Sequence, residues 1–211
     1  MKQFITRRSF IKAAGAATAL TAVSVGAPAA FAEETNCFFG DKADVTIFYT
    51  NDVHTYIDNK SPKPTYAAIA ALKKSIEDTG RDVLLVDAGD HIQGTAYGSM
   101  DDGATIIELM NEAGYDLATP GNHEFDYGMA RAKAIIKEAD FPYVSCNWVD
   151  LRTGLKVLPS IKFFFVGGRK IAFVGVTTPE TFTKSTPAYF MNDAQTKYIY
   201  DILGGEDGQK L

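Results

Sequence analysis

The sequence alternates between short runs of β-branched or apolar residues and longer stretches with helical spacing. The predicted strands cover 45–50, 83–86, 116–118 and 142–147. The predicted helices cover 65–78, 104–113 and 127–139. Strands that alternate with helices in this way are typical of βαβ units. The alternation therefore predicts an α/β fold with a parallel sheet.

The boundaries of these elements also have local signals. Gly80 and Gly114 follow the first two predicted helices, where glycine commonly ends a helix, and Asp126 is expected to be the N-cap of the third. Further on, 161–166 and 170–177 flank a Gly-Gly pair, which predicts a β-hairpin. After Pro179 the sequence is polar and weakly patterned.

Three polar clusters follow three successive predicted strands. They are Asn51-Asp52-Val53-His54, Asp87-Ala88-Gly89-Asp90 and Gly121-Asn122-His123-Glu124. Each cluster alone is common in loops and turns. Ligand sites of open α/β sheets lie at the carboxyl ends of the strands, so the three clusters are expected to meet at one edge.

In this order the clusters resemble the signature of the calcineurin-like metallophosphoesterases, and 87–95 and 121–126 resemble the 5′-nucleotidase branch of that family. The resemblance covers about 45–183. It implies an α/β/β/α layered sandwich, of which this chain holds the N-terminal portion. The activity implied is metal-dependent hydrolysis of phosphate esters, most often of nucleotides.

The resemblance also implies a site with two divalent metal ions. Asp52 and His54 would hold the first ion, Asp90 would bridge both ions, and Asn122 would give an oxygen to the second. A pair of cations activates water and neutralises charge on phosphoryl oxygens. Oxygen and imidazole donors without sulfur suit Zn, Mn or Fe.

By the same resemblance, His123 is the catalytic imidazole, and Asp126 orients its ring and stabilises its charged form. Gly121 is expected to let the backbone approach the site. Glu124 is expected to contact the ligand residues and not the ions. His91 is also treated as a supporting residue. It adjoins Asp90, but a side chain next to a ligand on an extended segment points away from that ligand.

The family pattern continues with further histidines in Gly-His contexts, but this chain has none after His123. We therefore expect 45–211 to be the N-terminal portion of a catalytic domain, with the C-terminal half and a nucleotide-binding domain absent. On its own the polypeptide is expected to turn over slowly or not at all. The alternatives left open are an inactive remnant, a thiosulfohydrolase-like member of the same superfamily, and a phosphodiesterase that does not act on nucleotides.

The first 32 residues are predicted to be a twin-arginine signal peptide. Arg7-Arg8 with Phe10 matches the export pattern, a weakly apolar stretch follows, and Ala30-Phe31-Ala32 offers a cleavage site. An uncleaved membrane anchor is the alternative. Cleavage predicts contact with the export machinery, a periplasmic or extracellular location, no stable membrane anchor, and an N-terminal extension over 33–44.

Charge and cysteine content narrow the function further. The chain has 21 basic and 26 acidic side chains, and the first 32 residues hold four of the basic ones and none of the acidic ones. An acidic chain of this kind excludes a nucleic-acid polymer as partner and favours a small phosphate ester. Cys37 and Cys146 leave two possibilities open, one disulfide or two free thiols.

Overall fold

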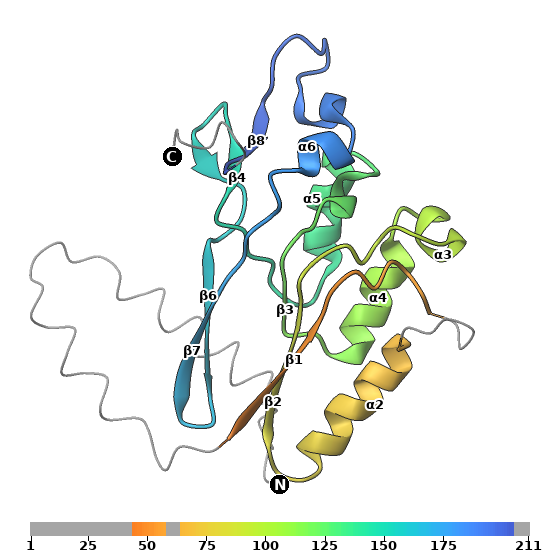
Figure 1. Ribbon diagram of the computed structural model, residues 1–211, viewed down its shortest axis with the longest axis vertical. Coiled ribbons are helices and arrows are strands. Elements are labelled where there is room, and N and C mark those ends of the chain that lie inside the picture. The colour runs from red at the N-terminus through yellow and green to blue at the C-terminus, as the bar shows by residue number, and fades with distance from the viewer. Residues whose placement is uncertain (1–43, 58–63, 205–211) are drawn as a thin grey trace, which may run out of the picture.

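The computed structural model describes residues 44–57 and 64–204, and a three-stranded parallel sheet lies at its centre (Figure 1). The strand order is β1-β2-β3. Thr50 pairs with Asp87, and Asp87 with Ala118, so the three strands end at the same level. The elements of the first half are β1 (Val45–Thr50), α2 (Tyr66–Glu77), β2 (Asp82–Asp87), α3 (Ala96–Ser99), α4 (Ala104–Ala113), β3 (Leu117–Ala118), η3 (His123–Phe125) and α5 (Met129–Glu138).

The second half is mainly antiparallel. A hairpin of β6 and β7 forms one sheet, and the order β5-β4-β8 forms another. The elements are β4 (Trp148–Asp150), β5 (Leu155–Lys156), β6 (Ile161–Val166), β7 (Arg169–Val174), α6 (Thr181–Lys184), η4 (Pro187–Phe190) and β8 (Tyr200–Ile202).

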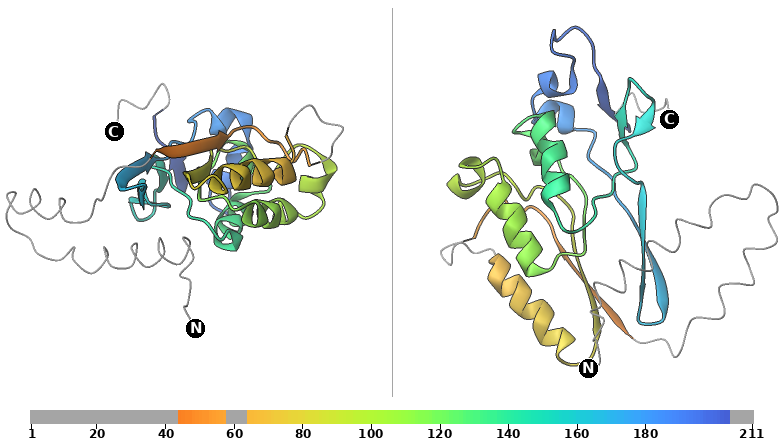
Figure 2. Two further views of the ribbon diagram at one scale, coloured as in Figure 1. Left: turned by 90° about the horizontal axis from the view of Figure 1, so that it is seen from below. Right: turned by 180° about the vertical axis from the view of Figure 1, so that it is seen from behind.

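Successive side chains of β2 point to opposite faces of the sheet and pack into two different hydrophobic clusters. Leu85 packs with the helices, in a cluster that includes Ile106 and Met110. Leu84 packs with Phe164 of the hairpin on the other face. The helices and the β6–β7 hairpin therefore cover opposite faces of the parallel sheet, as Figure 2 shows from two further directions. This arrangement gives the expected α/β layering, with the hairpin as a second β layer.

Most predicted elements are present, and two of them have local causes that the sequence indicated. Thr65 caps α2 by accepting a hydrogen bond from the backbone N–H of Ala68 at 3.2 Å. Gly114 ends α4 with φ of 77°. That left-handed conformation is accessible to glycine at little cost.

One predicted helix is present with shifted ends and a different N-cap, and one predicted strand was wrong. The helix expected over 127–139 begins at Met129, and Gly128 rather than Asp126 is its N-cap. Within 142–147, expected to be a strand, the pairing is limited to a single parallel bridge between Tyr143 and Ala118. After Val144 the backbone leaves β3, because the N–H groups of Ser145 and Cys146 bond to the carbonyls of Pro159 and Gly175. The buried amide of Asn147 then donates to the carbonyls of Thr177 and Leu203.

The segment after Pro179 is more ordered than its composition indicated. Phe190 of η4 is fully buried and packs against Phe125 of η3 and Phe182 of α6. The aromatic residues of this segment therefore attach α6 to the loop that follows β3. Cys146 is half-buried. Its suggested partner Cys37 lies outside the described residues, so that pairing stays a prediction.

Candidate metal centre

The loops after β1, β2 and β3 bring three of the predicted residues into one cluster. One ligand atom each from His54, Asp90 and His123 lies within 4.8 Å of the other two. The rings of His54 and His123 meet edge to face with centroids 4.9 Å apart. These side chains come from three different strand ends, so the parallel register of the sheet is what places them together.

The loop after β1 holds its two predicted ligands in unusual backbone conformations. Asp52 and His54 have φ of 54° and 50°, in the left-handed region. That region costs a residue with a β-carbon about 1 kcal/mol. The two side chains nevertheless approach one another, with Asp52 Oδ1 at 3.5 Å from His54 Nε2. Strained residues of this kind cluster at functional sites.

Hydrogen bonds to His54 define which of its ring nitrogens is free. Nδ1 lies 3.1 Å from the carbonyl oxygen of Gln93. A carbonyl only accepts, so Nδ1 carries the proton and Nε2 of the neutral ring keeps its lone pair. This is the arrangement found in metal-binding histidines.

Asp90 is bonded through its side chain to the loop after β3. Its Oδ1 accepts a 2.8 Å hydrogen bond from the backbone N–H of His123, which joins the loop after β2 to the loop after β3. Burial raises the pKa of Asp90, and the nearby carboxylate of Glu124 raises it further. A cation beside such a carboxylate would stabilise its ionised form.

The two residues that follow Gly121 have different surroundings. Asn122 is buried, and its Nδ2 has no hydrogen-bond partner among the described residues. Rotating the amide by 180° would put Oδ1 at that unpaired position, where it could serve as a ligand to a cation. His123 donates from Nδ1 to Asp126 at 2.6 Å, which leaves Nε2 as its free nitrogen.

Gly121 has a steric reason to be glycine. A β-carbon built there would overlap Oδ1 of Asp90 and crowd the rest of that carboxylate. A β-carbon on Gly89 would in turn overlap the backbone of Gly121. The two loops therefore pack backbone to backbone at the site, and Gly121 allows this close approach.

His91 lies away from the cluster in a fully buried position. Its Nδ1 donates to Asp87 at 2.8 Å and its Nε2 lies 2.8 Å from the hydroxyl of Tyr143. Burial lowers the pKa of His91, but Glu124 and Asp87 outweigh burial and raise it to about 9. Glu124 shows the converse, because His91 and backbone N–H groups lower its pKa in spite of burial.

Sequence reasoning gave no role to Asp87, although it named that residue in the second polar cluster, and it did not single out Lys184. Asp87 is buried at the end of β2 and accepts from Thr50, His91 and the backbone N–H of Gly89. Lys184 of α6 is ion-paired with Glu180, whose hydrogen bond is the main reason that its pKa is raised. Asp90 and Asp52 also raise that pKa, although the lysine is exposed and paired with Glu180. The signal for Asp87 was a charged residue at the end of an apolar strand, whereas Lys184 had none.

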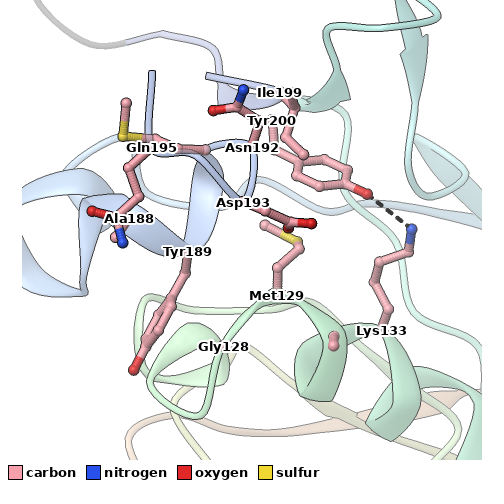
Figure 3. Close-up of a pocket in the computed structure, with 12 residues that line it drawn as sticks. Gly128, Met129, Lys133, Ala188, Tyr189, Asn192, Asp193, Gln195, Ile199 and Tyr200 are labelled. Atoms are coloured by element: carbon pink, nitrogen blue, oxygen red, sulfur yellow. Dashed lines mark hydrogen bonds between the residues drawn. The ribbon is translucent and has the colours of Figure 1, made fainter. Parts of the chain in front are cut away.

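A hollow of about 570 Å³ lies beside α5, between that helix and the segment that leads into β8 (Figure 3). Its lining includes Met129, Tyr189 and Asp193, and Lys133 donates to the hydroxyl of Tyr200 at 3.1 Å across one side. None of the predicted site residues lines it.

Residues 45–203 match the calcineurin-like phosphoesterases. The chain belongs to this family, whose members are hydrolases that use divalent metals. The resemblance of its motifs and its α/β fold class are thereby confirmed.

The relatives within the family include 5′-nucleotidases. The chain is 33% identical over 166 residues to a snake venom 5′-nucleotidase of Gloydius brevicauda, and 34% identical over 166 residues to the 5′-nucleotidase of Homo sapiens. These alignments cover 70% and 68% of this chain but 28% of each relative. A 5′-nucleotidase precursor from Thermus thermophilus superposes with a TM-score of 0.62 at 27% identity, covering 79% of this chain and 33% of the other.

The N-terminal prediction is confirmed in part. Residues 5–24 match the twin-arginine translocation signal sequence, which indicates export, although these residues lie outside those that the structure describes. The cleavage site and the extension over 33–44 stay predictions. Within 44–57 and 64–204, no helix has the length and apolar character needed to cross a membrane.

Proposed function

We propose that this chain carries the first part of an exported, two-metal active site that hydrolyses phosphate esters of nucleotides. The observation that carries the proposal is the convergence of His54, Asp90 and His123 within 4.8 Å at the ends of three parallel strands. Similarity to 5′-nucleotidases over most of the described chain favours nucleotides as substrates.

In this proposal Asp52, His54, Asp90 and Asn122 would hold the divalent cations, with Asp52 and His54 serving one ion and Asn122 the other. Bound cations of this kind supply Lewis acidity toward phosphoryl oxygens and a hydroxide nucleophile at neutral pH. Zn, Mn and Fe all suit this donor set, because oxygen and imidazole ligands occur without sulfur. The free lone pair on Nε2 of His54 and the unpaired amide of Asn122 support these assignments.

His123 is proposed to contact a phosphoryl oxygen of the substrate or to donate a proton to the leaving oxygen. Its Nδ1 is committed to Asp126, so Nε2 is the atom that can contact a phosphoryl oxygen or protonate the leaving oxygen. Asp126 keeps the ring in that orientation and stabilises its cationic form.

The two-ion state needs more donors than these residues supply. The chain has three histidines, and His91 is committed to Asp87 and Tyr143. Because the chain covers 28% of these 5′-nucleotidase relatives, we propose that 45–211 is the N-terminal portion of a catalytic domain. The relatives have further chain that could complete the site.

The test is cation binding and phosphate release by the whole chain. We expect Mn²⁺ or Co²⁺ to bind, and any release of phosphate from AMP to depend on that metal. Asp90→Ala and His54→Ala should abolish binding, and His123→Ala should abolish release. Asp78→Ala, at the exposed C-terminal end of α2, is the matched control. Metal-dependent activity that survives Asp90→Ala and His123→Ala would refute the assignment.

A further inference from the structure

Glu124 joins the two loops that carry Asp90, Asn122 and His123. Although its side chain is a carboxylate, the residue is only 2% exposed. Oε2 accepts the backbone N–H of Gly121 at 2.6 Å and that of Asp90 at 2.8 Å. Oε1 accepts the backbone N–H of His91 at 2.8 Å. One side chain thus bonds to the loop after β2 and to the loop after β3.

The backbone of the Asp90 loop is shaped around this carboxylate. Asp90 has φ of 60°, in the left-handed region, and the N–H groups of Asp90 and His91 both point to Glu124. The N–H of Ile92 also reaches Oε1, at 3.4 Å. Successive N–H groups around a left-handed residue form a concave site for an anion. A carboxylate provides enough acceptor positions for all these donors, whereas an amide has one acceptor oxygen and adds two donors of its own.

A buried carboxylate also needs a counter-charge, because burying an unpaired ion is costly. His91 Nδ1 lies 3.5 Å from Oε1 of Glu124 and 2.8 Å from Asp87. Tyr143 holds the other ring nitrogen at 2.8 Å. The imidazole therefore sits between two buried carboxylates, one from β2 and one from η3.

We propose that Glu124 is a positioning residue that sets the separation between Asp90 and the Asn122–His123 pair, and thereby the affinity of the site for a divalent cation. The 2.8 Å bond from the His123 N–H to Asp90 Oδ1 spans the same two loops and depends on their relative position. This inference rests on the proposed metal-binding function, but its first consequence can be measured without a metal.

That consequence concerns amide protection in the metal-free chain. In Glu124→Gln we expect the amides of Gly121, Asp90 and His91 to exchange with solvent at least tenfold faster than in the wild type, by hydrogen exchange and NMR. The amides of β2 should keep their protection. Glu112→Gln, an exposed glutamate on α4, is the control. Unchanged protection at the three amides in Glu124→Gln would overturn the proposal.

The second consequence concerns Co²⁺, added alone and followed by calorimetry and by its visible absorption. We expect Glu124→Gln to bind Co²⁺ at least tenfold more weakly than the wild type. Equal affinity of Glu124→Gln and the wild type would overturn the proposal even if the amides lose protection.

Two further variants make each result decisive. Co²⁺ binding that His54→Ala leaves unchanged would defeat the proposed metal site itself, while amide exchange would still report on whether Glu124 holds the loops. If far-UV circular dichroism shows that Glu124→Gln does not fold, Glu124→Asp replaces it. It keeps the charge but shortens the reach, so we expect the same three amides to lose protection and Co²⁺ affinity to fall. Wild-type values for both would overturn the proposal.

Discussion

The Nδ1 atom of His123 donates a 2.6 Å hydrogen bond to the carboxylate of Asp126, three residues further along the chain. The contact forms because η3 places residues 123 and 126 on one side of a short 3-10 turn, in which the backbone N–H of Asp126 also bonds to the carbonyl of His123. The pair thus fixes both the tautomer of the imidazole and the direction in which Nε2 points.

Replacing Asp126 with alanine should therefore separate ring orientation from metal binding. We expect the rate of metal-dependent phosphate release to fall by about 10²-fold or more, which is the usual contribution of a positioned general acid or base. Co²⁺ affinity should stay within about twofold, because Asp126 holds no ion in the proposal. ¹⁵N NMR of the imidazole should show that Nδ1 loses its fixed proton. A wild-type release rate in this variant would exclude a role for the pair.

Gly121→Ala tests whether the close approach of the two loops is required. The new methyl group would overlap the Asp90 carboxylate, so we expect cation affinity to fall at least tenfold and stability to fall by about 1–3 kcal/mol. Gly80→Ala is the matched control, because it has open space around it but a φ of 83°. It should cost about 1 kcal/mol of stability and leave the binding of Co²⁺ unchanged. Calorimetry and chemical denaturation give the two readouts.

The strands and helices of the parallel sheet could be predicted from the sequence because they depend on residues that are close together in the chain. The strand β1 and the helix α4 have the bounds that composition, periodicity and a terminal glycine indicate. The sequence also predicted that the three polar clusters would meet, since parallel strands end at a common edge. Asp126 shows the limit of such reasoning, because an aspartate before a helix usually caps it, whereas here the histidine competes for the same carboxylate.

What could not be predicted depends on long-range contacts. The bonds of His91 involve Tyr143, 52 positions away, and the bonds of Glu124 reach back 33 and 34 positions. No spacing rule connects such residues. The strand expected over 142–147 failed for the same reason, because Ser145 and Cys146 bond to Pro159 and Gly175 of later segments.

Two buried tyrosines in contact should differ in how the free energy of unfolding responds to the loss of the hydroxyl group. Tyr66 and Tyr115 meet edge to face with ring centroids 6.2 Å apart. The hydroxyl of Tyr115 donates to Thr50 at 2.9 Å, whereas that of Tyr66 has no hydrogen-bond partner among the described residues. Tyr115→Phe should therefore lower the free energy of unfolding by about 1 kcal/mol.

Tyr66→Phe should leave the free energy of unfolding unchanged or raise it, because the variant removes a buried polar group that is not satisfied. Urea denaturation of the two variants beside the wild type measures both effects. A loss in Tyr66→Phe as large as that in Tyr115→Phe would mean that the Tyr66 hydroxyl is satisfied after all.

Alkaline pH should unfold the protein through its buried tyrosines. Burial, reinforced by the Asp87 carboxylate for Tyr66 and Tyr115 and by Glu124 for Tyr143, raises the pKa of all three phenols. A pKa that is higher in the folded state than in the unfolded state contributes stability below the unfolded value, about 10 for tyrosine, and that stability is lost as pH rises above it.

We therefore expect the free energy of unfolding to fall steeply above about pH 10, where an unfolded tyrosine begins to ionise. Ultraviolet titration should show these three of the ten tyrosines ionising only as circular dichroism reports unfolding. We call the ionisation that accompanies unfolding the late phase. Tyr49, which is 76% exposed on β1, is the control, and Tyr49→Phe should leave the late phase unchanged. Tyr143→Phe should reduce that phase by one tyrosine. If all ten tyrosines ionise in one early step while the fold persists, the phenols of Tyr66, Tyr115 and Tyr143 are reached by solvent in the folded protein.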